Sequence, residues 1–226
     1  MLMNIFLDIE TIPGQAPGLR DELAANIRPP GTLKKPESIA AWERDEKPAA
    51  VEEAWLNTAL DGTYGQVCVI GLAVDDSEPV TFSNEGDLSD GAEAELLLQA
   101  FAELSRLNRG TSGTRPVLIG HNLIGFDLPF LWRRAVVRRV RPPFWLPRTP
   151  KPWADNVADT MLMWAGDRGT IGLDRLCRAL GIPGKDGMTG ADVWPAVQAG
   201  QIDRVAEYCA ADVERTRAVW RRLTWA

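Results

Sequence analysis

The stretch that decides the fold lies near the amino terminus and reads Asn4-Ile5-Phe6-Leu7-Asp8-Ile9-Glu10-Thr11. Residues 4–9 are mostly apolar on both faces of an extended chain, which is typical of a central strand covered on both sides by helices. This strand therefore predicts an α/β fold. The acids Asp8 and Glu10 close the apolar run, and they lie where the strand is expected to end.

Further strands and helices follow in an order typical of a mixed sheet flanked by helices. We expect strands at residues 66–74, 79–82 and 116–120, and helices at residues 90–107, 126–140, 159–164, 173–180 and 202–220. The turn Asp75-Asp76-Ser77 separates the first two of these strands. A length of 226 residues fits a single domain.

Residues 13–62 interrupt this order and are expected to form an insertion after the first strand of a single domain that spans residues 1–226. The segment is rich in proline and then becomes helical around residues 39–60. An insertion of this length in a compact domain usually serves a function or a partner. We expect the partner to be a replication or repair protein.

The composition is that of a globular chain, with 45% hydrophobic and 25% charged residues. No apolar run reaches the roughly 20 residues of a membrane-spanning helix, so no membrane partner is expected. Cys68, Cys177 and Cys209 are too few and too widely spaced for a disulfide framework or a zinc site, and they suit a reducing cytoplasm. The net charge of −6 does not exclude nucleic acid, because a metal-binding enzyme needs local carboxylates.

Three motifs carry acids that could meet in the fold. Asp8 and Glu10 share one face of a strand, because side chains alternate along it. Two adjacent carboxylates are costly unless a cation neutralises them, and a hard cation such as Mg²⁺ prefers oxygen ligands. Asp127 follows a short strand at the expected start of a helix. Tyr208 and Asp212 are four residues apart in the last helix and therefore share a face.

Each motif alone has a structural alternative. An acid pair after a strand also occurs in solvated loops, and Asp127 fits a simple helix cap. Tyr208 and Asp212 also fit a core residue and a surface charge on one amphipathic helix. The order of the three motifs along the chain favours the functional interpretation over these alternatives.

This order resembles that of the DEDD exonuclease superfamily, ribonuclease H-like in fold, in its tyrosine-bearing branch. The resemblance is closer still to stand-alone proteins related to the proofreading exonuclease domain of family-B DNA polymerases. It rests on the stretches Asp8-Ile9-Glu10-Thr11-Ile12-Pro13, Gly181-Ile182-Pro183-Gly184-Lys185, Gly190-Ala191-Asp192-Val193-Trp194 and Tyr208-Cys209-Ala210-Ala211-Asp212-Val213. The sister branch has a histidine shortly before the final aspartate, whereas the single histidine here is His121.

The resemblance implies a 3′–5′ exonuclease that removes nucleotides from the 3′ ends of nucleic acid, with single-stranded or frayed DNA as the expected substrate. It also implies two divalent ions, Mg²⁺ or Mn²⁺. Hydrolysis of a phosphodiester calls for them independently, because it must generate hydroxide and stabilise charge on the phosphate and the leaving oxygen. The expected metal ligands are Asp8, Glu10, Asp127 and Asp212. Tyr208 is expected to orient the attacking water.

Contacts to the substrate are expected around these acids and in a basic stretch. Asn122 is expected to hydrogen-bond a sugar or phosphate, and Phe126 either stacks on a base or packs in the core. Residues 131–153 hold several arginines and no acid, which favours binding of a phosphate backbone, although arginines at this spacing also form solvated helix faces. The candidate substrate contacts are Thr11, Asn122, Phe126, Arg138, Arg139 and Lys185.

Two more polar residues have an expected structural role. Asp159 is expected to cap the helix that follows it, and a supporting role beside the metal ligands is the alternative. His121 is expected to be structural or to line the substrate site.

Two other functions remain open at this point. A non-catalytic nucleic-acid-binding or polymerase-accessory module on the same fold would have lost some of the acids, and all four are present. An RNA-trimming exoribonuclease would share the acids and differ in contacts to the 2′ position, which sequence motifs do not specify.

Overall fold

The computed structural model describes residues 2–109, 115–184 and 187–226 of the chain. Five strands form one sheet in the order β3-β2-β1-β4-β5, with β1 at its centre. Their bounds are β1 Leu2–Ile12, β2 Gln66–Val74, β3 Val80–Ser83, β4 Arg115–Gly120 and β5 Val157–Asp159. Strand β1 is antiparallel to β2 and parallel to β4, so the predicted mixed sheet is confirmed. Strand β5 has no counterpart among the predicted elements.

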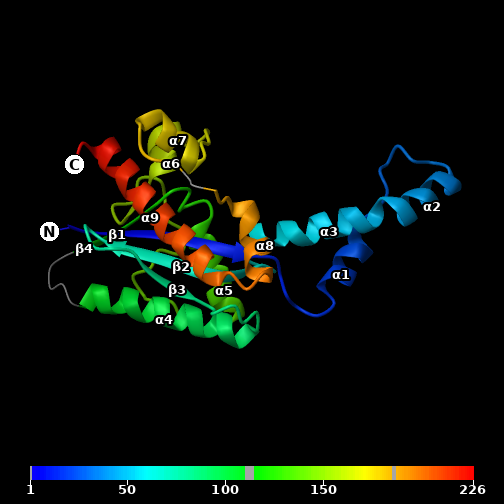
Figure 1. The fold of residues 1–226 in the computed structure, drawn as a ribbon, viewed down its shortest axis with the longest axis horizontal. Coiled ribbons are helices and arrows are strands. Elements are labelled where there is room, and N and C mark those ends of the chain that lie inside the picture. Colours follow the sequence, from blue (N-terminus) through cyan, green and yellow to red (C-terminus); the bar gives the residue numbers. More distant parts are fainter. Residues whose placement is uncertain (1, 110–114, 185–186) are drawn as a thin grey trace.

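Helices cover both faces of the sheet, and a helical segment extends away from it (Figure 1). The helices of the body are α4 Asp90–Arg109, α5 Asp127–Val137, α6 Thr160–Ala165, α7 Leu173–Leu180, α8 Val193–Gln198 and α9 Ile202–Thr224, with a short 3₁₀ helix η2 at Gly190–Asp192. All five predicted helices of the body are present, whereas α8 and η2 were not predicted. None of the helices built from the described residues combines the length and the apolar character of a membrane span.

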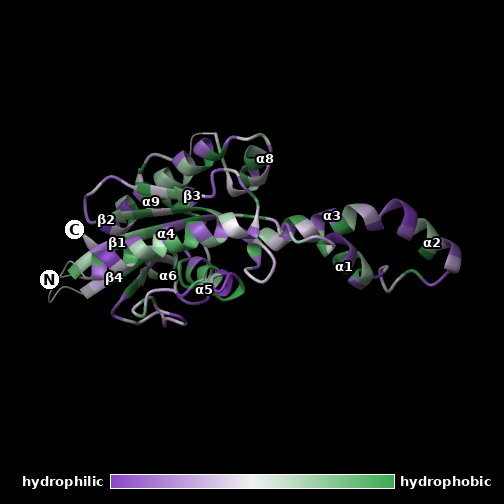
Figure 2. Cartoon of the chain, turned by 90° about the horizontal axis from the view of Figure 1, so that it is seen from below, coloured by the Kyte–Doolittle hydropathy of each residue, from purple (hydrophilic) through white to green (hydrophobic). Residues whose placement is uncertain are grey.

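The alternation of side chains along β1 divides its residues between two cores. Ile5, Leu7 and Ile9 belong to the core under α4 and α5. Phe6 belongs to the core under α9. Asp8 is two residues after Phe6, so its side chain lies on the same face of β1 and points toward α9. Apolar residues are concentrated in the strands and in the helix faces that cover them (Figure 2).

Between β1 and β2, residues 13–62 form a helical arm that projects from the body (Figures 1 and 2). Its helices are α1 Leu19–Asn26, α2 Pro36–Asp45 and α3 Lys47–Asn57, followed by the 3₁₀ helix η1 Thr58–Leu60. The predicted helical stretch is confirmed by α2 and α3. Helix α1 was not predicted, because Leu19 is its one buried residue and its apolar periodicity is weak.

The base of the helical arm is fixed to the body by a tryptophan pair. The ring of Trp55 on α3 meets that of Trp194 on α8 edge-on, with 5.5 Å between centroids. The indole N–H of Trp55 donates to the carbonyl oxygen of Gly14 at 2.8 Å. The hydroxyl of Thr58 accepts a hydrogen bond from the N–H of Gly14 at 2.9 Å. These contacts hold the two ends of the arm together where it leaves the sheet.

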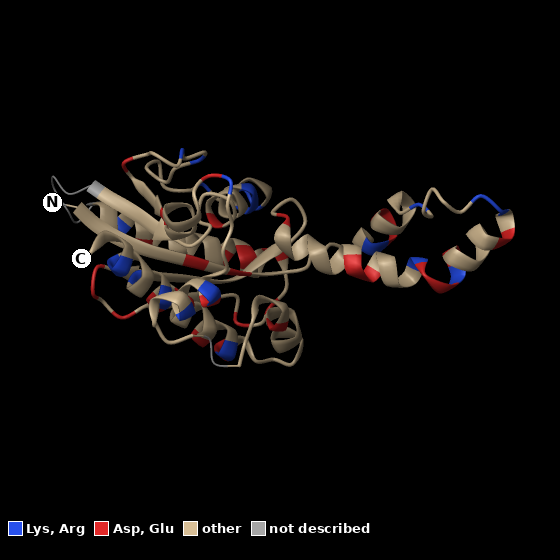
Figure 3. Ribbon diagram, turned by 90° about the horizontal axis from the view of Figure 1, so that it is seen from above, with Lys and Arg blue, Asp and Glu red and all other residues tan. Residues whose placement is uncertain are grey.

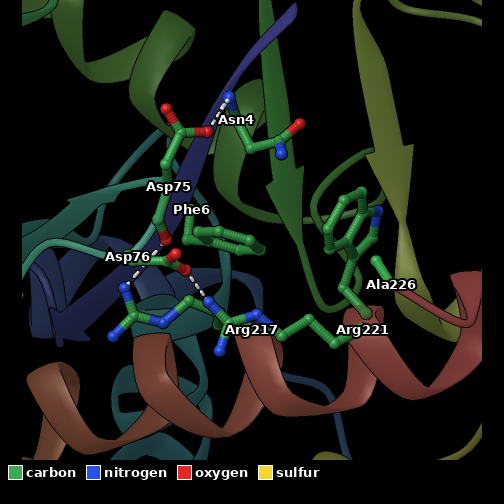
Figure 4. Close-up of a pocket in the computed structure, with 8 residues that line it drawn as sticks. Asn4, Phe6, Asp75, Asp76, Arg217, Arg221 and Ala226 are labelled. Carbon is green, nitrogen blue, oxygen red and sulfur yellow. Dashed lines mark hydrogen bonds and ion pairs between the residues drawn. The ribbon is translucent and has the colours of Figure 1, made fainter.

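At the far end of the sheet, a pocket separates α9 from the turn between β2 and β3 (Figure 4). Arg217 donates to the carbonyl oxygens of Asp75 at 3.0 Å and Ser77 at 2.6 Å. Arg221 forms an ion pair with Asp76. Both arginines are thus engaged with the turn, and the pocket is part of the connection between α9 and the sheet.

A buried ion pair connects α4, α5, β2 and the base of the arm. The guanidinium of Arg134, a residue that is 1% exposed, makes two hydrogen bonds of 2.8 Å to the carboxylate of Glu93. Glu93 also accepts a hydrogen bond from the N–H of Val67 at 2.9 Å. Arg134 donates in addition to the carbonyl oxygens of Gly62 at 3.3 Å and Thr63 at 3.2 Å. Four separate segments therefore depend on this pair.

The substitution Arg134→Met should lower the free energy of unfolding by up to about 3–5 kcal/mol, because it removes the more deeply buried of the two guanidinium groups that compensate the charge of Glu93. Urea denaturation followed by circular dichroism measures the loss. The control Arg106→Ala breaks an exposed pair with Glu103 and should leave the urea midpoint unchanged. Equal midpoints for the two variants would show that the buried pair does not stabilise the fold.

Candidate active site

Residues from separate motifs meet around the second half of β1. The pairing of β1 with β4 ends at Phe6, so the backbone N–H of Ile9 lies beyond it. The carboxylate of Asp127, the first residue of α5, accepts a hydrogen bond from this N–H at 3.1 Å. This hydrogen bond holds Asp127 beside Ile9, the residue between Asp8 and Glu10.

Helix α9 brings the last motif to the same place. One oxygen each of Asp8 and Glu10 and the sulfur of Cys209 lie within 4.8 Å of one another. The thiol of Cys209 donates to Asp8 Oδ2 at 3.5 Å. Gly71, opposite Asp8 on β2, permits this close packing, because a Cβ there would lie 2.9 Å from the sulfur of Cys209. The proximity of Cys209 to the acids was not anticipated from the sequence.

Tyr208 and Asp212 are both buried and lie one helical turn apart on the face of α9 that meets the acids. The hydroxyl of Tyr208 donates a hydrogen bond to the carboxylate of Asp212. Burial, followed by the negative charges of Asp212, Glu10 and Asp8, raises the pKa of Tyr208 well above its ordinary value. The phenol therefore stays protonated at physiological pH and acts as a hydrogen-bonding group.

The electrostatics of Asp127 fit a cation site. The side chain is 3% exposed, and burial followed by repulsion from Asp8 raises the pKa of Asp127 well above its ordinary value. A divalent cation would stabilise the charged form of such a carboxylate, and carboxylate oxygens are the ligands that hard cations prefer. Asp8, Glu10 and Asp127 thus present carboxylate oxygens of the kind that Mg²⁺ or Mn²⁺ prefers.

Arg215 is a part of the site that the sequence did not point to. Its guanidinium forms an ion pair of 2.8 Å with Asp212 and donates to the carbonyl oxygen of Gly184 at 3.0 Å. It thus connects α9 to the loop that precedes η2. The spacing of three residues between Asp212 and Arg215 on one helix is the signal that could have indicated the pair.

Asp159 organises the loop that leads into Asp127. Its Oδ1 accepts hydrogen bonds of 3.0 Å from the N–H groups of Asn122 and Met161, and its Oδ2 accepts one of 3.0 Å from Ile124. The bond from Met161 confirms the predicted cap of α6. The other two hold Asn122 in a left-handed conformation with φ 63°. One carboxylate therefore serves both as the cap and as a support for the site.

His121 has a structural position next to this loop. Its Nδ1 lies 2.9 Å from the hydroxyl oxygen of Thr160, and its Nε2 lies 2.8 Å from the carbonyl oxygen of Ile171. A carbonyl only accepts, so Nε2 carries a proton. The ring thus connects the loop after β4 to α6 and to the segment before α7.

Three predicted substrate contacts lie close to the acids along the chain. The hydroxyl of Thr11 donates to a backbone carbonyl of η1 at 2.7 Å and so joins β1 to the arm. Asn122 packs against Gly125, where a Cβ would lie 2.4 Å from its Oδ1. Phe126 packs on Phe130 with 5.4 Å between ring centroids, which is the packing alternative expected for it.

Of the other three predicted contacts, two belong to the described residues. Arg138 forms ion pairs with Asp90 at 2.5 Å and with Glu93, so its guanidinium is directed toward α4. Arg139 is exposed and ends α5 with φ 57°. Lys185 lies outside the described residues.

The fold and the acids around β1 define the class of protein as a ribonuclease H-like exonuclease domain. The chain belongs to the family of predicted 3′–5′ exonucleases related to the exonuclease domain of PolB, whose model matches residues 59–226. The description of this family agrees with the activity that the sequence motifs predicted. The matched range begins after β1 and most of the arm, so Asp8 and Glu10 precede it.

Comparison with solved structures confirms the predicted fold. The family B DNA polymerase from the hyperthermophilic archaeon Pyrobaculum calidifontis matches with a TM-score of 0.57 and 15% identity, over 99% of this chain and 25% of the polymerase chain. A structure of exonuclease I has a TM-score of 0.42 and 12% identity. E. coli exonuclease I in complex with a dA16 oligonucleotide has a TM-score of 0.37 and 15% identity. Each of the two matches to exonuclease I covers 92% of this chain and 43% of the exonuclease I chain.

This chain therefore spans a quarter of the polymerase and less than half of exonuclease I. The comparison with curated proteins found no match.

The substitution Asp159→Ala should lower the free energy of unfolding by about 2–4 kcal/mol, because it removes a helix cap and leaves partly buried N–H groups without this acceptor. Asp159→Asn keeps one acceptor oxygen and should lose less. The exposed acid Asp203, in the first turn of α9, supplies the control Asp203→Ala. Equal urea midpoints for Asp159→Ala and Asp203→Ala would contradict the assigned role.

Proposed function

We propose that this protein removes nucleotides from the 3′ ends of single-stranded or frayed DNA by metal-dependent hydrolysis of the terminal phosphodiester. The observation that carries the proposal is the convergence on β1 of acids from separate motifs, with Tyr208 beside them. The relation of the family to a DNA polymerase favours DNA over RNA as the substrate.

In this proposal Asp8, Glu10, Asp127 and Asp212 hold two divalent ions, Mg²⁺ or Mn²⁺. When bound, such ions supply a hydroxide nucleophile and stabilise charge on the phosphate and on the leaving 3′ oxygen. The protein contributes a rigid ligand set, because Asp127 is anchored to the backbone of β1 and Asp212 projects from the long helix α9. The raised pKa of Asp127 supports a cation at this position.

Tyr208 positions the attacking water by a hydrogen bond in this mechanism. Its raised pKa argues against a role as a general base, since the phenolate is not populated at working pH. Its place one turn before Asp212 keeps the hydroxyl beside the proposed ligands. A positioning role of this kind depends on geometry more than on proton affinity.

The whole chain acts in this proposal as a single exonuclease domain in which residues 13–62 are an insertion that binds a replication or repair protein. The projection of the arm, with acidic and basic residues distributed along it, supports a partner-binding role (Figure 3). Three free, buried cysteines support a reducing cytoplasm as the location.

The proposal is tested with a 5′-labelled single-stranded DNA oligonucleotide incubated with Mg²⁺ or Mn²⁺, beside an RNA twin and a duplex. We expect a ladder that shortens from the 3′ end and disappears with EDTA. Asp8→Ala and Asp212→Ala should each lower kcat by about 100-fold or more, because each removes a ligand of the reaction's cations. The matched control Asp203→Ala removes an exposed acid of α9 and should retain full activity.

Activity close to that of the wild type in either purified alanine variant would contradict the assignment of the ligands. Shortening of the RNA twin alone would identify an exoribonuclease. Binding of DNA without cleavage, with both metals, would identify the non-catalytic module instead.

The variant Tyr208→Phe should lower kcat by about 10- to 100-fold and leave KM nearly unchanged, because the water loses its orienting hydrogen bond. The pH dependence of kcat from neutral to moderately alkaline pH should keep the shape of the wild type, since the phenol does not titrate there. Loss of an alkaline limb in the variant would show instead that Tyr208 is the titrating base.

A further inference from the structure

A pocket of about 320 Å³ opens beside the loop that leads into Asp127. It is lined by residues of that loop, of α5 and of a proline-containing segment: Ile124, Pro129, Trp132, Arg133, Arg148, Thr149 and Pro150. The lining contains two cations, an indole and no carboxylate. This combination differs from the pocket between α9 and the β2–β3 turn, where arginines and acids are paired (Figure 4).

The two arginines of this pocket differ from their neighbours along the sequence. Arg134 and Arg138 both pair with Glu93, so their charges are neutralised within the fold. Arg133 and Arg148 are exposed, and within the part of the chain that the structure describes neither pairs with a carboxylate. Their positive charges are therefore available to an anion from solution.

In the pocket the guanidinium of Arg148 lies over the ring of Trp132. The guanidinium carbon of Arg148 lies 4.2 Å from the centroid of the Trp132 ring. A guanidinium held over an indole is oriented by the cation–π interaction and still keeps N–H donors for a phosphate. Aromatic and guanidinium planes are also surfaces on which nucleobases stack.

The pocket lies next to the segment that carries Asp127. Ile124 belongs to the loop held by Asp159, and Pro129 lies in the first turn of α5, which begins at Asp127. Arg133 packs against Gly62 at the base of the arm, where a Cβ would lie 3.1 Å from its own Cβ. A strand whose 3′ end reaches the acids can thus extend past this pocket.

We propose that Trp132, Arg133 and Arg148 form a subsite for a nucleotide unit upstream of the cleaved bond. The arginines bind a backbone phosphate, and the surface of Trp132 and Arg148 stacks against a base. The subsite rests on the proposed function, because it takes the same strand whose 3′ end is cleaved. It assigns the strand-holding role to arginines other than Arg138, which is engaged with α4.

The test compares a ten-nucleotide oligothymidylate with thymidine 5′-(p-nitrophenyl phosphate), which is too short to reach the pocket. In the double variant Arg133→Ala/Arg148→Ala, KM for the oligonucleotide should rise by about 10-fold or more, and hydrolysis of the short substrate should be unchanged. The slope of log KM against log salt should fall by about 0.7, since the two arginines share one phosphate and each phosphate contact on a single strand contributes about 0.7. Trp132→Leu should raise KM by about 5-fold or more through lost stacking.

The matched control is Arg106→Ala/Arg178→Ala, which removes the same charge from exposed positions on α4 and α7. Its KM and salt slope should equal those of the wild type. Equal values for the pocket variant and this control would overturn the subsite. An equal loss on both substrates would also overturn it, since a subsite upstream of the cleaved bond cannot affect the short one.

Failure of the proposed function has a different signature, in which the wild type cleaves neither substrate. Fluorescence anisotropy of the labelled oligonucleotide then decides the subsite. Weaker binding by the pocket variant than by the control would support it, and equal binding would overturn it. Urea midpoints equal to that of the wild type establish that each variant is folded.

Discussion

The hydrogen bond from the Ile9 N–H to the Asp127 carboxylate is the constraint on which the candidate site depends. Strand β1 continues beyond its pairing with β4, and a buried N–H needs an acceptor. A carboxylate in that position satisfies the backbone and also places a charge beside Asp8. Burial disfavours the charged form of this carboxylate and raises the pKa of Asp127. A structural requirement of the strand thereby creates a place for a cation.

Other buried acids of the same chain are satisfied by donors and serve the scaffold. Glu93 accepts from two arginines and from the N–H of Val67, and Asp159 accepts from backbone N–H groups of two segments. Their partners hold α4, α5 and the loop before Asp127 in place. Asp8, Glu10 and Asp127 differ from these scaffold acids because they lie among other carboxylates, whereas Asp212 combines both features, since it also pairs with Arg215.

A net charge of −6 is compatible with a nucleic-acid substrate because acidic and basic residues gather in different places. Acids gather around β1, where metal ions would offset them. On the outer side of α5, Arg133 and Arg148 line a pocket that contains no acid. In the proposed mechanism a strand is held by these cations while its terminal phosphate is processed among carboxylates whose charge the metal ions offset.

The sequence by itself determined the elements with a clear period and the motifs that lie within them. The bounds of β2, the shared parity of Asp8 and Glu10, and the helical spacing of Tyr208 and Asp212 are local properties of the chain. Only the tertiary structure decided that β5 forms, because this strand depends on pairing with β4. It also decided which arginines of α5 are buried in ion pairs and which are exposed. Glu93 lies 41 residues from Arg134, and no local spacing encodes which arginine a distant carboxylate will meet.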